Sequence, residues 1–242
     1  KRARQALALT GSGNEMADLF GISRFTATQG DGRAFGGKSV GIWPAATNLI
    51  TNGGCETNAT GWTLDGSTIA RITTQQKFGS ASLEVATSNL SANEGAYHTF
   101  AGAASTQYTV SGWVRGASGT VRVALWDAVA GRQASAAVTL TGTWQRITVT
   151  ATTGAASVAW RAYFETDVQQ TITFDVDGAQ VQTGAIATPY VETDGGTATR
   201  SAARVQIPMA QLRMSGTQGW MAMSCAPGWT TANDPAAMFW AW

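Results

Sequence analysis

Residues 108–115, YTVSGWVR, alternate apolar and polar or bulky side chains, so that Val110 and Trp113 fall on opposite sides of an extended chain. The stretches 121–126, VRVALW, and 157–165, SVAWRAYFE, follow the same period of two. This period is typical of antiparallel strands with one face in a core. The side chains predicted to be buried in that core are Val110, Val123, Leu125, Val158, Phe164 and Phe174.

Four further short segments are rich in Val, Ile, Thr and aromatic residues and are separated by Gly, Ser, Ala and Asn, as expected of strands joined by turns. They are 82–85, 137–140, 144–150 and 171–181. Seven or more short strands with no alternating helices predict an all-β protein. We expect an antiparallel β-sandwich of jelly-roll or immunoglobulin-like topology.

The composition excludes several function classes. The 242 residues carry 16 basic and 15 acidic side chains, a net charge of +1, which argues against a nucleic-acid binder. Hydrophobic residues make up 44% of the chain and can fill a core. No apolar run approaches the roughly 18 residues that a membrane span requires.

The metal-binding and nucleophilic residue types are scarce. One histidine, His98, and two cysteines, Cys55 and Cys225, cannot build a His/Cys zinc site without carboxylates. A pair of nucleophile and base is disfavoured as well, because His98 is far in sequence from either cysteine. We expect two free, buried thiols, with a Cys55–Cys225 disulfide as the alternative.

The chain divides into four parts by composition. Residues 1–47 are polar and rich in Gly, lack a core of their own, and are predicted to be an extended arm held by another domain or another copy. Residues 48–193 hold the predicted strands, and 194–202, DGGTATRSA, read as a linker. Residues 203–242 are dense in Trp and Met and too few to close a core, so we expect the start of a second β-sandwich that continues in a longer polypeptide.

Five segments in order resemble a known fold. They are NLITNGGCE with GWT (48–56 and 61–63), FGSASLEV (78–85), YTVSGWVR (108–115), TWQRIT (143–148) and FDVDGAQV (174–181). In this order they resemble the carbohydrate-binding modules of families 4, 9 and 22, which share a galactose-binding-like jelly roll. Cys55 stands where these modules usually have Phe, and a small buried thiol can fill part of that pocket.

The flanking segments resemble a narrower group. GIWPAATNL (41–49) is similar to the segment that leads into such modules in phage tail and virion proteins, although Trp43 replaces an acidic residue. GAQVQTGAIATPY (178–190), continuing to TRSA (199–202), looks like the segment that leaves them. A laminin-G or concanavalin-like sandwich often follows there, and QGWMAM (218–223) resembles its start.

Aromatic and planar polar side chains on the non-core sides of three predicted strands form a candidate glycan-binding face, since sugar rings pack on aromatic rings while their hydroxyls bond to planar polar groups. These residues are Trp113, Arg115, Arg122, Trp126, Arg161, Tyr163 and Glu165. The alternative is that the two tryptophans pack under a loop or a neighbouring subunit, and that the charged residues form solvated cross-strand pairs.

The resemblance also implies a structural calcium site at Glu56, Asp177 and Asp175, because it places the first Glu and the last-strand Asp near each other. Calcium takes six to eight oxygen ligands, so backbone carbonyls of residues 77–80 would have to contribute. The alternative is that these carboxylates cap turns or pair with Arg71 or Lys77.

The resulting expectation is a structural and adhesive phage virion protein, in a tail, a fibre or the head decoration, with no catalytic activity of its own. Its partners would be other virion subunits or copies of itself, together with host-surface glycans. The alternative is a secreted accessory module of a polysaccharide-degrading enzyme. A glycosidase would need two carboxylates across a cleft, and nothing distinguishes Glu165 and Asp167 from ordinary strand-end acids.

Overall fold

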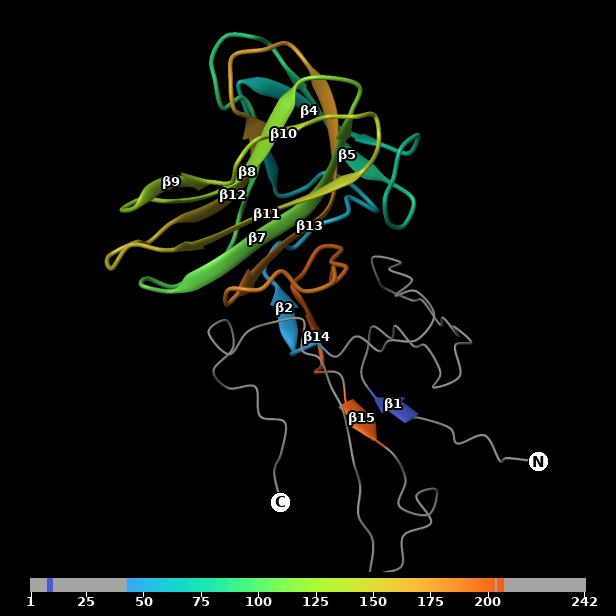
Figure 1. Ribbon diagram of the computed structural model, residues 1–242, viewed down its shortest axis with the longest axis vertical. Helices are drawn as coiled ribbons and strands as arrows, with labels where there is room; N and C mark the ends of the chain where they lie inside the picture. The colour runs from blue at the N-terminus through green and yellow to red at the C-terminus, as the bar shows by residue number, and fades with distance from the viewer. Residues whose placement is uncertain (1–7, 11–42, 203, 207–242) are drawn as a thin grey trace, which may run out of the picture.

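The computed structural model describes residues 8–10, 43–202 and 204–206. Every regular element in these residues is a β-strand, and the strands between 62 and 183 form two facing sheets (Figure 1). The predicted antiparallel β-sandwich is therefore confirmed. No helix in the described part of the chain is long and apolar enough to cross a membrane.

The first sheet has six strands in the order β10-β8-β12-β6-β3, with β9 also paired to β8. Its strands are β3 (Trp62–Asp65), β6 (Gly95–Thr99), β8 (Thr120–Asp127), β9 (Gly131–Ala134), β10 (Val138–Thr139) and β12 (Trp160–Thr166). All of its pairings are antiparallel. We call it the six-stranded sheet.

The second sheet has five strands in the order β11-β7-β13-β5-β4, again all antiparallel. Its strands are β4 (Ser67–Ile72), β5 (Ser82–Thr87), β7 (Gln107–Gly116), β11 (Gln145–Thr152) and β13 (Thr173–Thr183). At several points the chain crosses from one sheet to the other between consecutive strands, as it does between β7 and β8 and between β12 and β13. Such crossovers are expected of a jelly roll.

A short ribbon joins the two ends of the sandwich domain. β2 (Ala46–Asn48) pairs antiparallel with β14 (Ala198–Arg200), so part of the predicted 194–202 linker is a strand. The Asn48 side-chain amide donates to the carbonyls of Ala179, at 3.0 Å, and Val191, at 2.9 Å. The Arg200 guanidinium donates to the carbonyls of Pro44 and Pro189, each at 3.2 Å. The segments that enter and leave the sandwich are therefore fastened side by side.

A second ribbon pairs β1 (Ala8–Thr10) with β15 (Arg204–Gln206). The remainder of the predicted arm at 1–47, and of the predicted second β-sandwich at 203–242, lies outside the described residues, as do Cys225 and the 218–223 segment.

The core lies between the two sheets and confirms five of the six predicted buried side chains. Val110, Val123, Leu125 and Phe164 are fully buried, and Phe174 is 1% exposed. Val158 is the exception, because its side chain is 82% exposed. β12 begins only at Trp160, where pairing with Asp127 of β8 starts, so Val158 belongs to the preceding loop and its match to the alternation was coincidental.

The packing explains two residues of the quoted segments. A Cβ at Gly112, in the middle of β7, would lie 2.5 Å from ring carbons of Phe164, so a glycine lets the facing sheet approach the backbone. Cys55 is a free thiol that is 1% exposed and belongs to the core, as predicted for a small residue in a Phe pocket.

Candidate functional site

The outward side of the six-stranded sheet gathers aromatic and charged side chains in cross-strand register. Trp126 of β8 lies between Arg161 of β12 and Arg132 of β9. Tyr163, two residues along β12, lies opposite Tyr97 of β6. Directly opposed residues on one face of an antiparallel pair have their Cβ atoms about 5 Å apart, which brings these side chains into contact. We call these five residues the aromatic–arginine cluster.

The side chains of the cluster stack on one another. The guanidinium carbon of Arg132 lies 4.3 Å from the ring centre of Tyr163, whose ring centre lies 4.9 Å from that of Tyr97. The guanidinium carbon of Arg161 lies 4.8 Å from the ring centre of Tyr97 and 4.5 Å from that of Trp126. Tyr163 is buried under this stack, whereas Tyr97, Trp126 and both arginines remain partly exposed.

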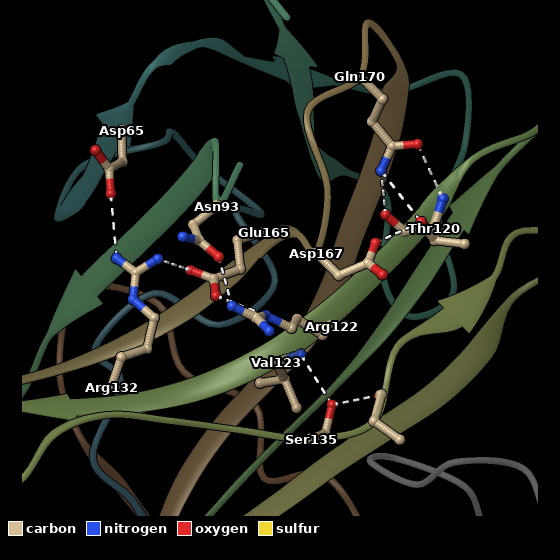
Figure 2. Close-up of polar contacts among 11 residues, drawn as sticks. Asp65, Asn93, Thr120, Arg122, Val123, Arg132, Ser135, Glu165, Asp167 and Gln170 are labelled. Carbon is tan, nitrogen blue, oxygen red and sulfur yellow. Dashed lines mark hydrogen bonds and ion pairs between the residues drawn. The ribbon is translucent and has the colours of Figure 1, made fainter. Parts of the chain in front are cut away.

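The buried carboxylate of Glu165 pairs with Arg132 of the cluster and with the neighbouring Arg122. Figure 2 shows the guanidinium of Arg132 between Glu165 and Asp65, with Nη1 at 2.6 Å from Glu165 Oε2 and Nη2 at 3.5 Å from Asp65 Oδ2. The second oxygen of Glu165 accepts from Nε of Arg122 at 3.0 Å, and Arg122 also donates to the side chain of Asn93. The Glu165 side chain is fully buried, so it positions arginines and is not itself an exposed contact.

The environment of Glu165 changes its proton affinity. Burial raises the pKa of Glu165 to about 7. The nearby guanidinium groups of Arg132 and Arg122 act in the opposite direction and lower it. A buried carboxylate is costly unless it is paired. The ion pairs with Glu165 therefore hold the guanidinium groups of Arg122 and Arg132 in place.

The prediction that one sheet face carries all seven candidate residues is wrong. Arg122, Trp126, Arg161, Tyr163 and Glu165 lie together on the six-stranded sheet, but Trp113 and Arg115 are in β7 of the other sheet. Alternation shows which side of a strand faces a core, and both sheets of a sandwich share that core. The period alone could not assign β7 and β8 to different sheets.

Trp113 and Arg115 are engaged by their own sheet and its loops. Phe78 packs edge-on against Trp113, with ring centres 6.3 Å apart, and the Lys77 ammonium lies 4.2 Å from the Trp113 ring centre. Arg115 forms an ion pair with Asp175 at 3.2 Å. For Trp113 the structure matches the alternative in which the ring packs under a loop.

Three residues of the face were missing from the sequence prediction: Tyr97, Arg132 and Asp65. Tyr97 lies in the short polar strand β6, and Arg132 in β9, where GRQA has no apolar alternation to mark a strand. The sequence indicated a hairpin there only through Gly131, a turn residue shortly after the predicted strand 121–126. In the structure Gly131 has a φ of +72°, which favours glycine.

Two of the three candidate calcium residues come together. A Cβ at Gly54 would lie 3.3 Å from Glu56 Oε1 and 3.7 Å from Asp177 Oδ1, and 3.2 Å from the hydroxyl of Tyr190. That hydroxyl is buried and has no hydrogen-bond partner among the described residues. Asp175 is not in this group, because it pairs with Arg115.

These oxygens suit calcium in kind but are fewer than the six to eight that it takes. Within the described residues no three His, Cys, Asp or Glu side chains converge on one point. The 77–80 loop was expected to supply carbonyls, yet it directs amide N–H groups at the carboxylates: Lys77 and Phe78 donate to Asp177 Oδ2, and Ser80 to Glu56 Oε2. Any further ligands would have to be water or other backbone carbonyls.

The buried position of Asp177 beside Glu56 and the 77–80 loop changes its pKa. Burial raises the pKa of Asp177 to about 7, the backbone N–H groups of Phe78, Lys77 and Gly178 lower it, and the neighbouring Glu56 raises it. A cation at this place would favour the ionised carboxylate.

Glu165 and Asp167, the two acids considered for glycosidase chemistry, both have partners. Glu165 is buried between two arginines, and Asp167 accepts a hydrogen bond from the hydroxyl of Thr120, as Figure 2 shows.

Comparisons with known proteins support the fold. No protein-family model and no curated protein matches the sequence. A xylan-binding domain of carbohydrate-binding module family 22 aligns with a TM-score of 0.50 and 18% identity over 58% of this chain and 98% of that domain.

Two other structures align more loosely. A Clostridium thermocellum endo-1,4-β-D-xylanase, solved as family 22 binding and GH10 modules complexed with xylohexaose, gives a TM-score of 0.49 and 17% identity over 58% of this chain. The chain spans only 29% of that xylanase. The tailspike protein 4 of bacteriophage CBA120 gives 0.43 and 13% identity over 56% of this chain and 21% of the tailspike. The described sandwich thus has the jelly-roll fold found in carbohydrate-binding modules.

Proposed function

We propose that this chain is a non-catalytic glycan-binding module and that the aromatic–arginine cluster is its binding surface. The observation that carries the proposal is the gathering of partly exposed Tyr97, Trp126 and Arg161 on one sheet face. Exposed aromatic side chains are costly to leave in water, and sugars bind to surfaces that combine such rings with planar hydrogen-bond donors.

The alternative surface on the five-stranded sheet is less suited to the task. Trp113 is packed against Phe78 and Lys77, and Arg115 is neutralised by Asp175. The solved structures with this jelly roll include a xylan-binding domain, which makes a glycan the natural class of ligand to test. The partners of Glu165 and Asp167 also favour binding without catalysis.

The biological setting belongs to the same proposal. We infer that the module is a structural and adhesive part of a phage virion, bound to other virion subunits or copies of itself and facing host-surface glycans. The resemblance of 41–49 and 178–202 to the flanks of virion modules supports this setting. The alternative is a secreted accessory module of a polysaccharide-degrading enzyme.

Affinity electrophoresis of the purified chain through gels containing xylan, galactan or purified bacterial surface polysaccharide tests the binding role. We expect retardation by at least one of these polymers, and Trp126→Ala should remove it, because stacking on one aromatic ring contributes about 1 kcal/mol beyond buried area and single sites of this kind bind weakly. Trp113→Ala is the matched control on the other sheet. Retardation that survives Trp126→Ala in a folded protein, or no retardation by any glycan, would refute the proposed surface.

A further inference from the structure

The charges on the binding face are unevenly matched. Three guanidinium groups, from Arg122, Arg132 and Arg161, share this face with two carboxylates, those of Glu165 and Asp65. Both carboxylates are taken up by Arg122 and Arg132, at 2.6 to 3.5 Å. Arg161 has no carboxylate within ion-pair distance in the described part of the chain.

Arg161 is nonetheless held firmly in place. Its guanidinium lies over the rings of Tyr97 and Trp126, and its Nη1 donates to the hydroxyl of Tyr163 at 3.3 Å. A guanidinium carries five N–H donors in its own plane, so four remain after this bond. A planar donor group that is already oriented by its neighbours loses little entropy when it binds a second planar group.

A carboxylate is the group that matches these properties. It is planar, carries the missing negative charge, and accepts two parallel hydrogen bonds from one guanidinium. Trp126 and Tyr97, partly exposed on either side of Arg161, would contact the ring of the same sugar. Building on the proposed function, we propose that the face selects acidic glycans and that Arg161 binds the carboxylate of a uronic acid residue.

Matched polymers test this preference without changing the backbone of the glycan. Polygalacturonate, alginate and hyaluronan would each be compared with their carboxyl-reduced, neutral forms by affinity electrophoresis or calorimetry. Dextran sulfate serves as a polyanion without carboxylates. We expect at least one native uronate polymer to bind about tenfold or more tightly than its reduced form, the ratio that a charge-assisted hydrogen-bonded pair supplies.

Substitutions then locate the preference. Arg161→Gln should abolish the difference between native and reduced polymer, and Arg161→Lys, which keeps the charge without the planar fork, should retain only part of it. Lys77→Gln is the control, since it removes the same charge from a loop beside the other sheet, where the ammonium lies over Trp113 of β7. Both positions are partly exposed, so the three variants should fold, and circular dichroism checks that they do.

The outcomes separate the two proposals. Equal affinity for native and reduced forms of all three polymers would overturn the acidic preference while leaving glycan binding intact. Dextran sulfate binding as tightly as the uronates, or a loss of equal size in Lys77→Gln, would overturn it as well, by showing general charge attraction. Failure to bind any acidic, reduced or neutral polymer would refute the proposed function itself.

Discussion

Replacing Arg132 with Met tests whether the buried ion pairs hold the aromatic–arginine cluster together. The substitution keeps most of the side-chain length over Tyr163 but removes the charge that faces Glu165 Oε2 at 2.6 Å and Asp65 at 3.5 Å. Glu165 is then left, fully buried, with Arg122 alone. Removing one partner of a buried ion pair lowers the free energy of unfolding by about 3–5 kcal/mol.

The expected loss is smaller than that range, because the Arg132 side chain is 23% exposed and Arg122 still bonds to the other oxygen of Glu165. We expect the free energy of unfolding to fall by about 2 kcal/mol at pH 8. The pKa of Glu165, about 7 in the folded protein, is above its ordinary value of 4.5, and loss of Arg132 raises it further. A folded-state pKa above the unfolded value gives stability that is present below the unfolded pKa and is lost as the pH rises through the folded one.

The penalty should therefore shrink on acidification, to less than about half at pH 5, where the carboxyl of Glu165 is protonated in the folded state. Urea unfolding of wild type, Arg132→Met, Glu165→Gln and the double variant at pH 5 and pH 8 measures it. In the Glu165→Gln background Arg132→Met should cost much less than alone. The same penalty at both pH values and in both backgrounds would show that Arg132 acts through packing on Tyr163 and not through the buried charge.

Two further predictions concern other parts of the sandwich. Calcium should raise the melting temperature of the chain, and the rise should be larger at pH 8 than at pH 6, because the pKa of Asp177 is about 7 and only the carboxylate binds a cation. Glu56→Gln should abolish the rise and Asp175→Asn should keep it. A rise that is unchanged in Glu56→Gln would show that the ion binds elsewhere. Trp113→Ala should lower the free energy of unfolding by about 2 kcal/mol, roughly half the cost for a fully buried Trp, and should leave glycan affinity unchanged. A loss of glycan affinity in the folded variant would contradict the assignment of the site to the six-stranded sheet.

The sequence predicted the sandwich well because alternation follows directly from burial of one strand face. The pattern that placed Val110, Val123 and Leu125 in the core depends only on which side of each strand meets apolar neighbours. It failed at Val158, where a loop happened to keep the period until pairing began at Trp160. Short polar strands such as β9 show no alternation of apolar and polar residues, so this pattern does not identify them.

The candidate site was predicted less completely, for a reason that lies in long-range pairing. Trp126, Arg161 and Tyr163 were identified from their strand faces, but their partner Arg132 becomes visible only when the 131–134 strand folds back onto β8. Trp113 was grouped with them because nothing local distinguishes the outer face of one sheet from that of the other. Strand order is set by crossovers, and these involve residues far apart in the sequence.

The β2–β14 ribbon determines how the module responds to mechanical tension. Ala46 lies opposite Arg200, so the chain enters and leaves at the same end of an antiparallel pair. Force applied through the two flanks would first open the outer β1–β15 ribbon and then separate the Arg200 contacts and the β2–β14 bonds one at a time, before it reached Asn48. In a force–extension experiment this geometry should appear as a low-force step ahead of the unfolding of the sandwich. The chain would then lengthen by opening the ribbon while both sheets, with the aromatic–arginine cluster, stay folded.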